Sequence, residues 1–428
     1  MNAHLYLTNG IYIDYKTLHF SNKILKVSKG QKGGIEFVNS IPENSEIFDC
    51  KGKYITKSFV NSHHHIYSTL ALGMPSPKII PNNFFEILKY IWWKLDKSLT
   101  QEMIEISALI SAINSIKNGV TFIIDHHSSP LSISDSLNTI KKSLDNGGVN
   151  SLLCYELSDR DGEKYVNEGI LETESFLEGG GQGLVGLHAS FTVSNKLLKK
   201  AVEIAENSKT GIHVHAAEDL IDQEITFKNN GERVIHRLNG AGVLSLSSSI
   251  LAHCIHIDKD ERALLASSNA WIVQNPESNL NNNVGIFSPE KIGDKTLLGT
   301  DGMNNNILGS SNIAFFVGNM IGNNTPSDIY ERLRNSHKYL QNNEFVGDND
   351  NNLVIFNYNP GTDFNSNNFY THFVYGMSRL SVDSVISNGE IIMKEKHILT
   401  LDEESILKKG KELSSLLWKK MGEVPVNN

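Results

Sequence analysis

The feature that most constrains the fold is a regular alternation of short apolar runs and amphipathic segments between residues 58 and 301. The apolar runs are rich in Val, Ile and Leu, as expected of repeated βα units around a parallel sheet. Eight of them are expected to be strands: Phe59–His65, Thr121–His127, Asn150–Leu157, Leu184–Ser190, Gly211–Ala217, Ser249–Ile257, Trp271–Asn275 and Thr296–Asp301. Eight strands close a TIM-like (β/α)8 barrel.

Four intervening segments have the periodicity of helices, and some begin with Thr, Ser or Asp where an N-cap belongs. They are Gln101–Lys117, Ile133–Asn146, Ser194–Ser208 and Asp219–Leu238.

Both ends of the chain have a different character. The first 57 residues contain short β-rich pieces between Asn, Gly and Pro turns. Similar pieces return near the C-terminus at Asn352–Asn357, Phe373–Tyr375, Val382–Ser387 and Glu390–Met393, before a last helix over Asp402–Met421. We therefore predict an α/β protein with a barrel over residues 58–354. Residues 1–57 and 355–428 are expected to form a composite β-sandwich domain that carries the C-terminal helix.

Composition argues against several kinds of partner. Apolar residues make up 39% and charged residues 20% of the chain, as in ordinary globular proteins. The net charge of −9 includes no basic run, so neither nucleic acid nor an anionic membrane is expected to bind. The three cysteines are widely spaced, and no signal peptide or bilayer-spanning stretch is evident. We expect a cytoplasmic protein that acts on a small molecule.

A histidine triplet, His63-His64-His65, ends the first barrel strand. Side chains two residues apart share a face of a strand, so His63 and His65 can point into the barrel together. Two imidazoles on one face suit a divalent metal, although a surface histidine cluster also produces a triplet. The position at the carboxyl end of a strand, where barrel active sites form, favours the metal site.

The fifth strand repeats this alternation in the string HVHAAED, which contains His213, His215 and Glu218. We interpret His215 as a further ligand and His213 as a hydrogen-bonded core histidine one layer below. Glu218 follows the strand end and can carry a proton over the metal. In the sixth strand His253 and His256 have odd spacing, so only one of them can face the metal.

The eighth strand ends at Asp301, which precedes a glycine that permits a tight turn. A buried aspartate is costly without a cation, so Asp301 is a fourth ligand or a base that orients water. Histidine and carboxylate ligands without cysteine suit Zn(II), Fe(II) or Mn(II), with zinc as the default.

These motifs, in this order, resemble those of the amidohydrolase superfamily over nearly the whole chain. The strings SFVNSHHHIYS, HVHAAED, LAHCIHI and LLGTDGM are similar to the family's motifs on strands one, five, six and eight. AHC, NPESN and GTDG resemble the branch of deaminases and chlorohydrolases. YIWWKLDKSLT, IIDHHSSP and CYELSDRDG look like the SsnA-type aminohydrolases within it.

The resemblance implies roles for individual residues and a possible homodimer. Four residues correspond to the ligands of one divalent metal ion: His63, His65, His215 and Asp301. Glu218 corresponds to the proton shuttle, His253 to the histidine beside the attacking water, and His188 to a substrate contact. The chain departs from the family in having Lys57-Ser58 where Pro-Gly is usual. The fourth strand has no lysine to bridge two metals, so one metal is expected.

The expected reaction is hydrolytic deamination of a purine-like or related nitrogen heterocycle. A metal-bound hydroxide, oriented by Asp301 and His253, would attack a carbon that bears an amino group. Glu218 would relay a proton to the leaving nitrogen. The same site could instead open a cyclic amide or displace chloride, and a non-catalytic metal-containing scaffold is a more distant alternative.

Substrate contacts are less determined by the sequence. Trp92 or Trp93 could stack on a flat ring, with core packing as the alternative. Arg160 could clasp an acidic or carbonyl group, or could be a solvated loop residue. One of His126 and His127 could enter the pocket, and His127 is the candidate we name.

Overall fold

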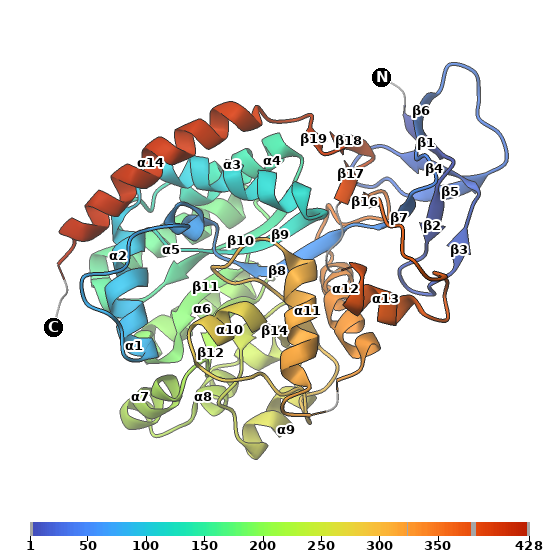
Figure 1. Ribbon diagram of the computed structural model, residues 1–428. Helices are drawn as coiled ribbons and strands as arrows, with labels where there is room; N and C mark the ends of the chain where they lie inside the picture. The colour runs from blue at the N-terminus through green and yellow to red at the C-terminus, as the bar shows by residue number, and fades with distance from the viewer. Residues whose placement is uncertain (1–2, 323, 378–381, 426–428) are drawn as a thin grey trace.

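The computed structural model describes residues 3–322, 324–377 and 382–425 of the chain. A barrel with surrounding helices forms the larger part, and a smaller β unit lies beside it (Figure 1). The described residues form an eight-stranded, a seven-stranded and a four-stranded sheet.

The eight-stranded sheet is parallel and its strands follow one another in chain order. The strands are β8 (Phe59–His64), β9 (Val120–His127), β10 (Asn150–Leu157), β11 (Val185–Ala189), β12 (Ile212–Ala216), β13 (Ile250–His253), β14 (Trp271–Gln274) and β15 (Thr296–Leu298). All eight lie where the sequence predicts them. The prediction of a TIM-like barrel with an additional sheet domain is confirmed.

The barrel closes between its first and last strands through residues that follow them. His64 and Asp301 form a parallel bridge, and the amides of Thr300 and Asp301 both donate to the carbonyl of His63 at 3.0 Å. The amide of His65 donates in turn to the carbonyl of Asp301 at 3.3 Å. The histidine triplet and the terminal aspartate of the sequence therefore meet at the closing seam.

Helices cover the outside of the barrel (Figure 1). They are α3 (Gln101–Lys117), α4 (Ser136–Gly147), α5 (Glu163–Glu178), α6 (Asn195–Asn207), α7 (Leu220–Asn230), α8 (Val234–Gly240), α9 (Lys259–Ser267), α11 (Ile307–Gly318) and α12 (Pro326–Asn342). The short α10 (Pro276–Asn281) lies instead at the carboxyl end of the barrel, where Ser278 contacts Asp301. The single helix expected over Asp219–Leu238 is two helices, because Gly231 ends α7 in the left-handed conformation at φ +74°.

Apolar side chains fill the interior of the barrel. One buried cluster joins strands on opposite sides and includes Val60, Phe122, Leu152, Ile250 and Val273. On β10 the alternate residues Leu152 and Cys154 belong to this cluster, whereas Leu153 and Tyr155 pack outward against the helices. Strand parity therefore decides which side chains face the barrel interior.

The smaller β unit combines both ends of the chain. One sheet has the order β5-β4-β1-β6, from β1 (His4–Thr8), β4 (Ile24–Ser28), β5 (Ile35–Val38) and β6 (Glu46–Asp49). The other has the order β19-β18-β17-β16-β7-β2-β3, from β2 (Ile11–Ile13), β3 (Phe20–Ser21), β7 (Tyr54–Lys57), β16 (Leu353–Phe356), β17 (Val382–Ser387), β18 (Glu390–Lys394) and β19 (His397–Ile398). Antiparallel pairing of β7 with β16 joins the two ends. The exact domain boundaries stay a prediction.

The C-terminal helix α14 (Glu403–Glu423) runs along the barrel helix α3 (Figure 1). Lys409 pairs with Glu102 on α3 at 2.6 Å, and the indole of Trp418 donates to the carbonyl of Leu70 at 2.9 Å. The end of the chain is thus fastened to the barrel, although the strands that precede it belong to the β unit.

One β-like piece expected near the C-terminus is helical. Phe373–Tyr375 lies in α13 (Phe369–Tyr375). Phe369 and Phe373 are four residues apart and both buried, so helical spacing places their rings on the same face of the segment. The run Phe-Val-Tyr alone looks like a strand, and the helix becomes evident only over the longer segment. Among the described residues, no helix is long and apolar enough to span a membrane.

Candidate metal centre and active-site pocket

The side chains of His65, His215 and Asp301 meet at the carboxyl end of the barrel. The Nε2 atom of His65 lies 2.8 Å from Oδ1 of Asp301 and 3.1 Å from Nε2 of His215. The Nε2 atom of His63 lies 3.4 Å from the same Asp301 oxygen. The structure therefore brings together the four residues that the sequence suggests as metal ligands.

Each histidine in this group is held through its Nδ1 atom. Nδ1 of His65 lies 2.6 Å from the carbonyl of His126, and Nδ1 of His215 lies 2.7 Å from the carbonyl of His188. Nδ1 of His63 contacts His213 at 2.9 Å. A carbonyl can only accept, so the Nδ1 atoms of His65 and His215 carry a proton and their Nε2 atoms face the centre. This is the arrangement of histidines that bind metals.

His253 extends the group on β13. Its Nε2 atom lies 3.9 Å from Oδ2 of Asp301 and 3.5 Å from Oε2 of Glu218. The Nε2 atoms of His63 and His253 are both buried, and neither has a hydrogen-bond partner among the described residues. Unpartnered nitrogens at one point, beside a carboxylate, are the donor set that a divalent cation would satisfy.

Two overlapping sets of side chains have ligand atoms within 4.8 Å of one another. One set is His63, His215, His253 and Asp301, and the other is His65, His126 and His215. These histidine and aspartate groups could hold a metal ion. His256, the other histidine of the sixth strand, donates toward the carbonyl of Val284 at 2.6 Å and lies outside both sets.

The charge of Asp301 dominates the electrostatics of the group. Burial disfavours the charged form of His65, but the Asp301 carboxylate outweighs this effect and raises the pKa of His65 to about 9. Burial also opposes ionisation of Asp301, but His65 and His63 hold its pKa well below the usual range. A buried carboxylate here requires positive charge, which a protonated histidine or a metal cation can supply.

Three residues around the centre have left-handed backbone conformations. The φ angles are +50° for Ala217, +75° for His253 and +53° for Asp301. Such conformations are uncommon for residues other than glycine and cluster at functional sites. The left-handed backbone at His253 changes the direction of its side chain. Ala252 belongs to the interior cluster, so in a regular strand the side chain of the next residue would point outward. Instead, the imidazole of His253 faces Asp301.

Glu218 lies just beyond β12 and lines the pocket. Its Oε1 atom accepts a hydrogen bond from Nδ2 of Asn282 at 3.4 Å. Burial raises the pKa of Glu218 well above its ordinary value, and the negative charge of Asp301 adds to this effect. The protonated form of Glu218 is therefore favoured beside His253.

Helix α10 holds three of these groups from one side. Ser278 donates to Oδ2 of Asp301, Nδ1 of His253 contacts Oδ1 of Asn279 at 2.8 Å, and Asn282 follows the helix end. The string NPESN contains both Ser278 and Asn279, but the sequence gives no reason to select either of them, or Asn282, for a contact with the centre. A sequence feature that could have pointed to them is Pro276, which indicates that a helix begins directly after the seventh strand.

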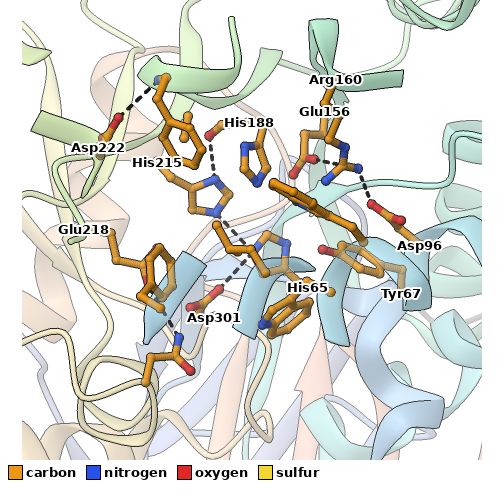
Figure 2. A pocket seen from close by; sticks show the side chains of 17 residues that line it. His65, Tyr67, Asp96, Glu156, Arg160, His188, His215, Glu218, Asp222 and Asp301 are labelled. Carbon is orange, nitrogen blue, oxygen red and sulfur yellow. Dashed lines mark hydrogen bonds and ion pairs between the residues drawn. The ribbon is translucent and has the colours of Figure 1, made fainter. Parts of the chain in front are cut away.

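The pocket includes His65, His215 and Asp301 of this centre, and aromatic and charged side chains line the rest of it (Figure 2). Trp92, Trp93 and His188 all line it, as the sequence suggests for His188 and for one or both tryptophans. The lining also includes residues that sequence reasoning missed: Tyr67, Phe84, Leu88, Asp96, Glu156, Phe191, Asp222 and Asn282. The helical segment between β8 and α3 supplies Phe84, Leu88 and both tryptophans.

Arg160 lines the pocket but its charge is engaged by the protein itself. Its guanidinium pairs with Asp96 and lies 3.0 Å from Asp161 and 3.6 Å from Glu156. It also lies over the ring of Trp93, at 5.5 Å from the centroid. The arginine is thus buried among carboxylates rather than presented free to a substrate.

His126 and His127 are adjacent on β9, so their side chains point to opposite faces of the strand. His126 shares the interior face with Phe122 and Ile124, and its Nε2 atom contacts the carbonyls of Leu187 and His213 at 3.1 and 3.2 Å. The Nε2 atom of His127 instead contacts Oγ of Ser129 at 2.9 Å. The structure does not bring His127, our candidate substrate contact, into the pocket lining.

The profile of the amidohydrolase family matches residues 54–338 of this chain. This chain belongs to the amidohydrolase family. Membership confirms the prediction of a hydrolase that acts on carbon–nitrogen bonds. The family uses a divalent metal, in agreement with the histidine and aspartate groups described above.

Several known proteins are similar to this amidohydrolase. A 5'-deoxyadenosine deaminase of Methanocaldococcus jannaschii is 27% identical over 426 residues, which cover 92% of this chain and 95% of that protein. A zinc-bound adenosine deaminase of Xanthomonas campestris aligns with a TM-score of 0.79 at 14% identity, covering 99% of both chains. A zinc-bound atrazine chlorohydrolase of Arthrobacter aurescens aligns with a TM-score of 0.80 at 15% identity, covering 96% of this chain and all of the other. At these identities the two structures show a shared fold.

Proposed function

We propose that this amidohydrolase is a metal-dependent aminohydrolase that deaminates a purine-like nitrogen heterocycle. The observation that carries the proposal is the proximity of a proton-bearing carboxyl group to a set of metal-type ligands. The Oε2 atom of Glu218 is 3.5 Å from Nε2 of His253, which is itself 3.9 Å from Asp301. Deamination needs both an activated water and a proton for the leaving nitrogen, and these groups are the means to supply them.

One divalent ion, zinc in the first instance, would be held by His63, His65, His215 and Asp301. Three nitrogens and one carboxylate oxygen form a donor set that suits zinc. When bound, such an ion lowers the pKa of a water and polarises the atom it contacts. β11 carries no lysine that could bridge a second ion, which supports a single metal.

The remaining steps belong to the side chains of the protein. His253 is held at Nδ1 by Asn279, so its Nε2 atom is free to accept a proton from the attacking water. Glu218 carries its proton on a carboxyl oxygen at the pocket and can donate it to the departing amino group. Burial keeps both groups away from bulk solvent, which would otherwise exchange these protons.

The aromatic wall is suited to a flat ring. Trp92, Trp93 and Phe191 line the pocket on the substrate side of the centre, and planar rings gain stacking contacts there in addition to burial. A similarity to a protein named 5'-deoxyadenosine deaminase over nearly the whole chain supports a purine as the flat ring.

Displacement of chloride from a heterocycle is the second candidate reaction, because a chlorohydrolase shares the fold. A leaving chloride needs no proton, so the high pKa of Glu218 favours an amino leaving group.

The experiment is a screen of zinc-replete protein against 5'-deoxyadenosine, adenosine, guanine and atrazine, with ammonia, chloride and ultraviolet absorbance followed together. Deamination predicts ammonia in step with the absorbance change of the purine. Chloride release from atrazine without ammonia from any purine would replace the proposal with the second candidate.

A further inference from the structure

Glu156 occupies a distinctive position in the barrel. It continues the interior face of β10 above Leu152 and Cys154, and its side chain is 2% exposed. It lines the pocket but lies on the opposite side from Glu218, next to Arg160 (Figure 2). The pocket therefore has one carboxyl group at the reacting centre and a second at its far wall.

The surroundings of Glu156 keep it charged. One carboxylate oxygen lies 3.4 Å from Nδ1 of His126, and the other lies 3.6 Å from Nη2 of Arg160. Burial opposes ionisation, but His188, His126 and Arg160 outweigh it and hold the pKa of Glu156 well below its ordinary value. Glu156 is therefore a hydrogen-bond acceptor at both oxygens across the working pH range.

The donors that the protein offers to Glu156 are distant. Its carboxylate lies 3.4 Å from Nδ1 of His126 and 3.6 Å from Nη2 of Arg160, both long for a hydrogen bond to a carboxylate. Arg160 donates instead to Asp96 and Asp161. A buried carboxylate with such weak donors is costly, so further donors supplied from the pocket would stabilise it.

The same wall opposes anionic ligands. Arg160 and Lys97 are the cations of this cluster, and the carboxylates of Asp96, Glu156 and Asp161 surround them. A phosphate or carboxylate of a substrate would meet Glu156 without an uncommitted cation to compensate. Donor groups without negative charge are the complementary chemistry.

We propose that Glu156 is the specificity-determining residue of this pocket, and that it accepts hydrogen bonds from uncharged donors at the end of the substrate away from the reacting carbon. The inference rests on the proposed function for its choice of substrates. Two kinds of molecule carry such donors: a nucleoside, through the two vicinal hydroxyls of its ribose, and a free purine, through the single N–H of its imidazole ring.

The test measures dissociation constants by calorimetry in the zinc-bound Glu218→Gln variant, where turnover does not interfere. One arm compares adenosine with 2',3'-dideoxyadenosine, and the other compares guanine with 9-methylguanine. The compound that keeps its donors, adenosine or guanine, should bind roughly tenfold or more tightly than its analogue in one of the arms, as expected for hydrogen bonds to a charged acceptor. Adding Glu156→Gln should remove most of the difference in dissociation constant between the compound and its analogue. The arm in which this happens shows whether the donors belong to a ribose or to a purine ring.

Two further variants keep the test decisive. Glu163→Gln changes an exposed glutamate on α5 that pairs with Lys196, and should leave this difference as it was. Glu156→Asp keeps the charge and should preserve part of the difference, and it carries the test if Glu156→Gln fails to bind zinc or to fold. No preference for donors in either arm, or an equal preference with and without Glu156, overturns the inference. Discrimination in binding without ammonia release by the wild-type protein contradicts the proposed function instead.

Discussion

The Nδ1 atom of His63 lies 2.9 Å from the Nε2 atom of His213, in the layer directly beneath the candidate metal centre. The other ring nitrogen of His213 lies 3.7 Å from Sγ of Cys154. With its proton on Nδ1, His213 accepts from His63 and leaves the Nε2 lone pair of His63 facing the centre. We expect His213→Phe to weaken zinc affinity by about 10- to 100-fold, the usual effect of removing a group that orients a ligand.

Zinc affinity of this variant can be measured by competition with a chelating dye. The matched control is His127→Phe, which also removes a buried barrel histidine but leaves the centre intact. Equal affinities in His213→Phe and wild type would show that His63 is oriented without His213.

Glu218→Gln should retain zinc and lose turnover by about 10²- to 10⁴-fold, the range for loss of a general acid or base. The amide has nearly the same shape as the carboxyl group but cannot deliver its proton to the leaving nitrogen. Metal content and the rate of ammonia release are the two measurements. Glu224→Gln, at an exposed position on α7, should change neither. Undiminished turnover in Glu218→Gln would remove this residue from the reaction.

Asn279→Leu should lower turnover without releasing zinc. Nδ1 of His253 lies 2.8 Å from Oδ1 of Asn279, and leucine leaves that proton without an acceptor. The imidazole can then turn or change tautomer, so we expect a loss of about tenfold or more in kcat. Asn279→Asp keeps an acceptor oxygen and should retain more activity than Asn279→Leu. A larger loss in Asn279→Asp would contradict the role given to this contact.

The free energy of unfolding should fall in mild acid because His337 is buried in its neutral form. Burial lowers its pKa to about 4 from an ordinary value of 6.5, and Arg334 donates to its Nε2 atom at 3.2 Å, which requires the neutral ring. The unfolded chain takes up a proton near pH 6.5 whereas the folded protein resists it down to about pH 4. Stability present above pH 6.5 is therefore lost progressively toward pH 4.

The loss between pH 7 and pH 5 from this one group should be about 2 kcal/mol. Denaturant titrations at the two pH values give the free energy of unfolding of the wild type and of His337→Gln. The pH-dependent difference should be smaller in the variant by about that amount. The same pH dependence in both proteins would show that His337 is not buried in its neutral form.

The sequence predicts the barrel well because each strand is a short apolar run bounded by polar turns. It also predicts the grouping of His63, His65, His215 and Asp301, since barrel strands bring their carboxyl ends to one place. The choice between His126 and His127 is harder. The preceding residues Phe122, Ile123 and Ile124 are all apolar because both faces of a parallel barrel strand are buried. Because apolar and polar residues do not alternate along this strand, the sequence does not show which side chains point into the barrel and which point toward the helices.

Other features depend on contacts between segments far apart in the chain. Glu156 looks like an ordinary residue near a strand end, and only its neighbours Arg160 and His126 show that it is a buried charge. His253 faces the centre because of a left-handed backbone angle, which strand periodicity does not anticipate. Ser278 and Asn282 acquire their roles from hydrogen bonds to Asp301 and Glu218, which follow other strands of the barrel.

The most direct test of the central claim is to titrate zinc into metal-stripped protein while measuring ammonia release from 5'-deoxyadenosine, or from whichever purine proves active in the screen. We expect no ammonia from the stripped protein, and a rate that rises with bound zinc and saturates at one ion per chain. Ammonia release from metal-free protein, or a rate that requires two ions per chain, would contradict it.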